Sequence, residues 1–160
     1  ATLTPLLGEV LNSMAGISLE HVPYKGVAPA INDVLGGQLP IVFASLPSAL
    51  PHIKAGKLRA LAVSGAKRSP ALPEVPAIAE AVPGYDGTLW IGLFAPAKTP
   101  PAILDTLRAA TLAVAPRLQE RLEQSGGQLI ARSGADAEPS VRAAYQRRTK
   151  VIADAGITLD

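Results

Sequence analysis

The sequence predicts an α/β fold built on a parallel sheet, and two observations carry this prediction. Short apolar runs with the composition of buried strands recur at 19–22, 39–43 and 58–63. The segments between them, 27–35 and 46–55, are long enough for crossover helices, and a glycine follows each one. Because right-handed βαβ units connect parallel strands, we expect residues 18–63 to form a βαβαβ core.

The loops after the first two predicted strands form the candidate binding site. In open parallel sheets, ligands bind beyond the carboxyl ends of the strands, so loops 23–26 and 44–47 should lie side by side. Each loop leads into a predicted helix N-terminus, where backbone N–H groups and the positive end of the helix dipole favour an anion. The sequence therefore predicts a carboxylate or phosphate site at this edge.

Composition narrows the classes of function. The net charge is +2, and basic residues gather only near the C-terminus, which does not indicate nucleic-acid binding. The absence of cysteine excludes disulfides, thiolate zinc sites and cysteine nucleophiles. His21 and His52 are far apart in the predicted layout and lack neighbouring carboxylates, so we expect no metal, and no motif indicates a cofactor.

The flanking segments complete the expected layout. Residues 2–14 carry apolar side chains at helical spacing, and Gly16 should end that helix. The stretch 65–87 is rich in proline, glycine and charge, with at most one short helix near 75–81. TLWIGLFAP, at 88–96, is the longest β-like run in the chain and fits a hinge strand between two lobes.

Residues after position 100 are expected to be mainly helical. Apolar residues recur at helical spacing, and Pro116 should separate a first helix from a second one that stops at 126–127, where two glycines stand. A short strand is expected at 128–131, followed by a last helix over 139–155.

Long ungapped words in this chain resemble the Bug family, the extracytoplasmic solute-binding receptors of tripartite tricarboxylate transporters, also called TctC-like. These words are HVPYKG, LGGQ and LPSALPHIKAGKLRALAVSGAKRSPALPEVPAIAEA. The likeness continues from WIGLFAPAKTP to VIADAGITLD, so it covers essentially the whole chain. It implies a fold like that of type II periplasmic binding proteins.

The resemblance also implies how the chain is divided into lobes. Residues 1–90 would form the second ligand-binding lobe, and residues 91–160 would supply the hinge strand and C-terminal helices that return to the first lobe. In this family nearly half of the polypeptide precedes the segment that matches residue 1. We therefore expect the chain to be the C-terminal half of a receptor.

The function implied by the resemblance is capture of a small carboxylate between two lobes, for delivery to the membrane subunits of the transporter. Such a receptor is a periplasmic binding protein and not an enzyme. The residues that match the ligand loops of the family are Ala1, Thr2, Tyr24, Lys25, Gly26, Ala44 and Ser45.

Each of these residues also has a simpler interpretation. Thr2 could serve only as a helix cap, while Tyr24 could cover the sheet edge beside a solvated Lys25. Ala44 and Ser45 stand where family members commonly have Asp-Asn, so a counter-ion for an ammonium group is missing and a plain carboxylate is favoured. Alternatively, that position lies behind the ligand shell and is merely repacked.

Two other functions stay open from the residues alone. One is a small α/β enzyme acting on a carboxylate substrate, for which Ser45, Lys25 and Tyr24 are the only candidate nucleophiles or bases, and the sequence reveals no orienting partner for them. The other is self-association, in which the exposed sheet edges of a fragment pair between copies.

Overall fold

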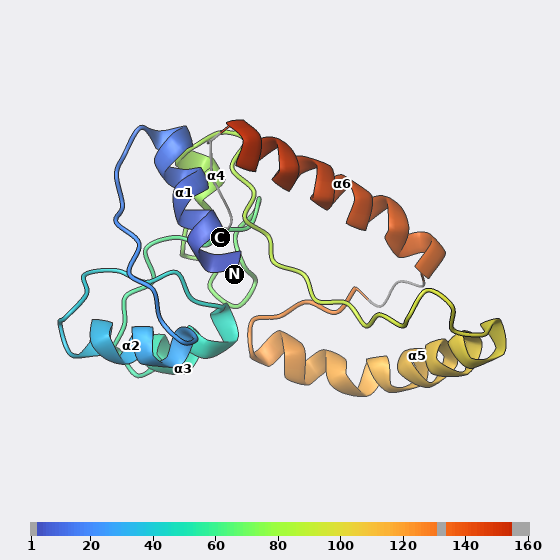
Figure 1. The fold of residues 1–160 in the computed structure, drawn as a ribbon. Helices are drawn as coiled ribbons and strands as arrows, with labels where there is room; N and C mark the ends of the chain where they lie inside the picture. The colour runs from blue at the N-terminus through green and yellow to red at the C-terminus, as the bar shows by residue number, and fades with distance from the viewer. Residues whose placement is uncertain (1–2, 131–133, 155–160) are drawn as a thin grey trace.

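A computed structural model describes residues 3–130 and 134–154, and within these ranges the regular structure is helical. Helices α1 to α4 gather at one end of the molecule, and the longer helices α5 and α6 extend away from them (Figure 1). Their bounds are α1 Leu3–Ala15, α2 Val27–Leu35, α3 Leu46–Lys54, α4 Ile78–Ala81, α5 Pro101–Gln124 and α6 Gly134–Asp154. Among the described helices, we find no candidate for a membrane-spanning segment.

The two predicted crossover helices are confirmed almost to the residue. Helix α2 occupies 27–35, and α3 ends one residue before the predicted end. Both end in a left-handed glycine, Gly37 at φ +73° and Gly56 at φ +69°. After α2, the Gln38 N–H donates to the Asp33 carbonyl at 2.8 Å, which is the six-to-one bond of a Schellman ending. These glycines end the helices because only they adopt a positive φ without strain.

The predicted strands do not pair into a sheet within the described residues. Segments 18–22, 39–43 and 58–62 have irregular structure, and the only β-bridge among the described residues is an isolated parallel one between Val63 and Ala77. Three of the apolar side chains expected inside the sheet are exposed: Val22 at 45%, Ile41 at 42% and Leu61 at 59%. A parallel strand needs ladder partners and helices over both faces. These segments lack that cover, so no paired sheet forms among the described residues.

The expected hinge strand at 88–96 is also absent from the described structure. Its central side chains are highly exposed, with Ile91 at 101%, Leu93 at 78% and Phe94 at 72%. Residues 89–95 make no backbone hydrogen bond to any other described residue. A run with strand composition adopts strand structure only beside a partner, and the described residues provide none.

The C-terminal helices differ from the prediction at their boundaries. Helix α5 runs unbroken through Pro116, because a proline removes one intrahelical bond at a cost of about 3 kcal/mol and can bend a long helix without ending it. Gly126, at φ +84°, follows the end of α5 as expected. No strand forms at 128–130, and the rest of that predicted strand lies outside the described residues. Helix α6 begins at Gly134, before the predicted start at 139.

Two contacts hold α3 and α1 against the irregular segments on either side of α4. In the first, Leu50 of α3 is 3% exposed and packs with Leu72 and Val75 of the following irregular stretch. In the second, the ring of Tyr85 is buried and its hydroxyl donates to the Leu7 carbonyl of α1 at 3.2 Å. Burial raises the pKa of Tyr85 to about 12.

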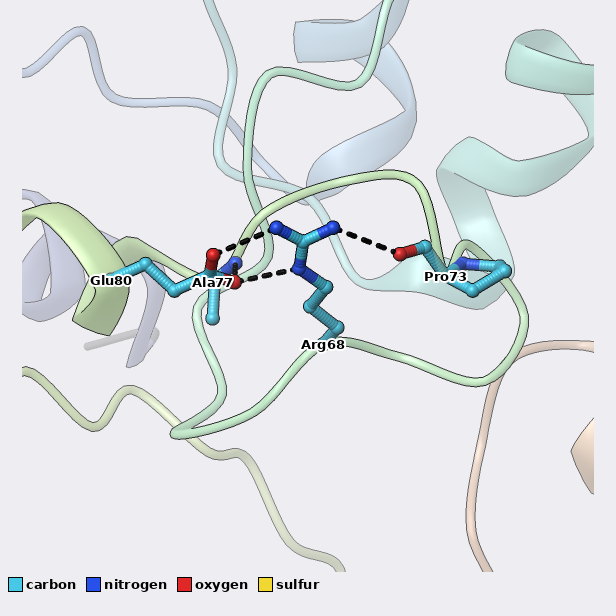
Figure 2. Close-up of polar contacts among 4 residues, drawn as sticks. All are labelled: Arg68, Pro73, Ala77 and Glu80. Carbon is cyan, nitrogen blue, oxygen red and sulfur yellow. Dashed lines mark hydrogen bonds and ion pairs between the residues drawn. The ribbon is translucent and has the colours of Figure 1, made fainter.

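An ion pair ties the irregular stretch to α4. Figure 2 shows the Arg68 guanidinium between the Glu80 carboxylate, at 2.7 and 2.8 Å, and the Pro73 carbonyl, at 3.2 Å. Glu80 also accepts from the Ala77 N–H at 2.9 Å. The Arg68 hydrogen bonds, followed by the Ala77 N–H, lower the pKa of Glu80 to about 2.

Candidate functional site

Tyr24 anchors the first candidate loop, 23–26, to the helix that follows it, α2. This half-buried tyrosine donates its hydroxyl proton to Oδ2 of Asp33, in the last turn of α2, at 2.5 Å. The hydrogen bond to Asp33, then burial and the Asp33 charge, raise the pKa of Tyr24. Since the hydroxyl has one proton and Asp33 takes it, the Tyr24 oxygen can meet a ligand only as an acceptor.

Lys25 and Gly26 complete this loop. Lys25 is exposed and makes no ion pair with any described residue, so its ammonium group faces solvent beside the start of α2. Gly26 has φ 109° and ψ 173° at the N-cap of α2. A Cβ atom there would meet nothing within 4 Å, so the glycine is required by the backbone conformation and not by crowding.

The second candidate loop ends at Ser45, the N-cap residue of α3. The hydroxyls of Ser45 and Ser48 are 2.8 Å apart and hydrogen-bonded, while the Ser45 carbonyl accepts from the N–H groups of Ser48 and Ala49. Ala44, just before it, is half-buried. The Ser45 hydroxyl therefore has another hydroxyl as its partner, which does not activate it as a nucleophile.

The starts of α2 and α3 are both electrostatically open. Neither N-cap residue makes a side-chain capping bond, and neither helix has an acidic residue in its first turn. The positive ends of both helix dipoles thus keep their capacity to stabilise an anion. A positive electrostatic environment of this kind is what the predicted carboxylate or phosphate site requires.

The structure places the predicted site residues in two groups and leaves two of them out. Helix α2 packs against α3, but the side-chain hydrogen bonds of each loop run to its own helix, and none joins the two loops among the described residues. Ala1 and Thr2 lie outside the described residues. A separate hollow on α5 has none of the predicted residues among its described lining, which is Leu118, Arg121, Leu122 and Ser125.

Asp33 is, together with Ser48, a residue of the site that sequence reasoning missed. The available signal was a tyrosine just before a nine-residue helix and an acidic residue near the end of that helix. No pattern distinguished Asp33 from an ordinary solvated helix carboxylate. The described His, Asp and Glu side chains form no group of three that could hold a metal ion.

Comparison with solved structures defines the class of fold. The R. palustris protein Rpa4515 with adipate matches with a TM-score of 0.87 and 35% identity, over 98% of this chain and 54% of that one. The periplasmic binding protein BugD matches with a TM-score of 0.86 and 31% identity, over 96% and 53% of the two chains. The fold is therefore that of this class of periplasmic binding proteins, and the backbone follows its course even where ladder bonds are missing.

Sequence comparison then defines the family. The profile of the TctC family, described as the tripartite tricarboxylate transporter family receptor, matches residues 1–157. This chain belongs to that family, which confirms the resemblance. A UPF0065 protein of Bordetella bronchiseptica is 38% identical over 144 residues, covering 89% of this chain and 43% of the relative. The chain thus spans about half the length of the proteins it matches.

Proposed function

We propose that this protein acts as part of a solute-binding receptor that captures a small carboxylate for a tripartite tricarboxylate transporter. The observation that carries the proposal is the family match over residues 1–157. Two structural neighbours add to it: Rpa4515 was solved with adipate, and MatC of Rhodopseudomonas palustris, at 26% identity, with bound malate. The family points to the periplasm as the place of action and to the transporter's membrane subunits as partners.

Capture in this proposal is electrostatic. The N-termini of α2 and α3 offer backbone N–H groups and uncompensated positive dipole ends, and Lys25 adds a full positive charge beside α2. Ser45 can donate to a carboxylate oxygen by rotating its hydroxyl away from Ser48. Ala1 and Thr2 are proposed to contribute a third loop from the start of the chain.

The chemistry of the second loop favours a plain carboxylate over an amino acid. Ala44 presents a methyl group where an acidic side chain would pair with an ammonium group. Without that counter-ion, an amino-acid ligand would have to leave its charge unpaired on binding, which costs affinity. Adipate and malate, the ligands of the two neighbours, are therefore the first compounds to test.

For the two lobes, we propose the division of the chain that the family resemblance implies. Residues 1–90 supply the ligand loops, and residues 91–160 belong to the other lobe. An enzymatic role is less well supported, because Ser45 is hydrogen-bonded to Ser48 and not to a base.

Calorimetric titration of the purified protein with adipate, malate and the uncharged diamide of adipate tests the proposal. We expect saturable binding of at least one dicarboxylate and none of the diamide. Lys25→Gln should weaken binding about tenfold, as expected for loss of one charge-assisted contact. Lys57→Gln is the matched control, because Lys57 is exposed just beyond the opposite end of α3. Equal affinities for acid and diamide, or equal effects of the two lysine variants, would contradict the proposed site.

A further inference from the structure

Asp33 connects three parts of the candidate site. Its carboxylate accepts the Tyr24 proton from the loop before α2. Its backbone carbonyl accepts from the N–H groups of Gln38, at 2.8 Å, and Leu39, at 3.3 Å, just after α2. The residue is half-buried in the last turn of the helix. Both ends of α2 therefore depend on one residue.

The Tyr24–Asp33 bond spans most of α2. Positions 27 and 33 are separated by about 9 Å along the axis, at 1.5 Å per residue, so the bond ties the segment before α2 to the last turn of the helix. The loop that carries Lys25 and Gly26 is thereby fixed at a second point besides its peptide link to the helix. Gly26, with φ 109°, could otherwise let that loop adopt other conformations.

We propose that Asp33 is a positioning residue for the carboxylate-binding loop, acting through the Tyr24 hydroxyl. This inference rests on the proposed function, because it assigns Asp33 a role in the same site. Asp33 holds Tyr24 along α2, and Tyr24 in turn holds Lys25 and the first N–H groups of α2 in the arrangement that receives the ligand.

The bond also fixes the hydrogen-bonding role of the Tyr24 hydroxyl toward a ligand. While Asp33 holds the tyrosine proton, the oxygen can accept from a ligand hydroxyl or a water molecule but cannot donate to a carboxylate. Loss of Asp33 frees that proton and lets the hydroxyl rotate. Tyr24 is thus kept from competing with the backbone N–H groups for the ligand's charged oxygens.

Four variants test the pair. Tyr24→Phe and Asp33→Ala each remove the bond, and each should weaken adipate binding about tenfold, which corresponds to one charge-assisted hydrogen bond. The double variant should lose no more than either single variant, because the two residues act as one unit. Asp33→Asn keeps a neutral acceptor and should recover part of the affinity. Tyr145→Phe, which removes the same atom from an exposed tyrosine of α6, is the control.

Amide hydrogen exchange on the same variants separates this inference from the proposed function. We expect faster exchange in residues 24–28 of the Tyr24→Phe and Asp33→Ala variants than in Tyr145→Phe, whether or not adipate binds. If the wild-type protein binds no dicarboxylate but this exchange still rises, the proposed function fails and the anchoring of the loop stands without its ligand role. Unchanged exchange, additive losses of affinity in the double variant, or no recovery in Asp33→Asn would overturn the role of Asp33.

Discussion

Replacing Gly26 with alanine perturbs only the backbone of the first candidate loop. At φ 109° and ψ 173° the residue lies outside the conformations that side-chain-bearing residues adopt readily. Holding a non-glycine residue in such a region costs roughly 1–3 kcal/mol. Because an added Cβ meets no atom within 4 Å, steric overlap adds nothing to this cost. We expect Gly26→Ala to lower the free energy of unfolding by about that amount.

Urea denaturation with two asparagine variants gives the sharper comparison. Gly37, at φ +73°, lies in the left-handed helical region that asparagine tolerates, and its added Cβ also meets nothing within 4 Å. Gly37→Asn should therefore cost less than Gly26→Asn, which should cost as much as Gly26→Ala. Equal costs for the two asparagine variants would refute the reasoning, because the loop would then not depend on the conformation of Gly26.

Three further predictions concern the frame around the site. Leu50→Ala should lower the free energy of unfolding by about 2–5 kcal/mol, and Leu112→Ala, at a position 42% exposed, should have a much smaller effect in the same urea assay. The pKa of Tyr85 is raised from 10.0 to about 12, so its neutral form stabilises the fold below pH 10, and that stability should be lost as the pH rises to about 12. In thermal melts, Tyr85→Phe should remove this alkaline loss of stability. An unchanged pH profile of the melting temperature would contradict the assignment. Glu80 has its pKa lowered from 4.5 to about 2, so its contribution is present above pH 4.5 and should fade as the pH falls to about 2. Melting temperatures of Glu80→Gln should therefore approach those of the wild type at the acid end of this range, and a constant difference between them would contradict it.

The helices of the candidate site could be predicted because their signals are local. Helices were predicted at 27–35 and 46–55 because these segments lie between apolar runs and are followed by glycine, and Gly37 and Gly56 do end them with the positive φ that glycine adopts easily. The placement of the two loops directly before helix N-termini follows from the same signals. Local chemistry was sufficient wherever the structure depends on residues a few positions apart.

The features that the sequence did not predict depend on contacts or energies beyond the local sequence pattern. The run at 88–96 has strand composition, but strand structure requires a neighbouring chain that composition does not identify. Pro116 was expected to end a helix, yet the loss of one bond is small beside the many bonds of a 24-residue helix. The Tyr24–Asp33 bond crosses α2 and is visible only in three dimensions.

Hydrogen exchange with and without adipate is the measurement that most directly tests whether the two loops form one carboxylate site. The account predicts that saturating adipate slows exchange in the peptides covering 23–28 and 44–48 together, since both helix starts would hold the same ligand. The hollow of α5 at 118–125 should show no change and serves as the internal reference. Protection confined to the α5 hollow, or absent from both loops, would contradict the central claim.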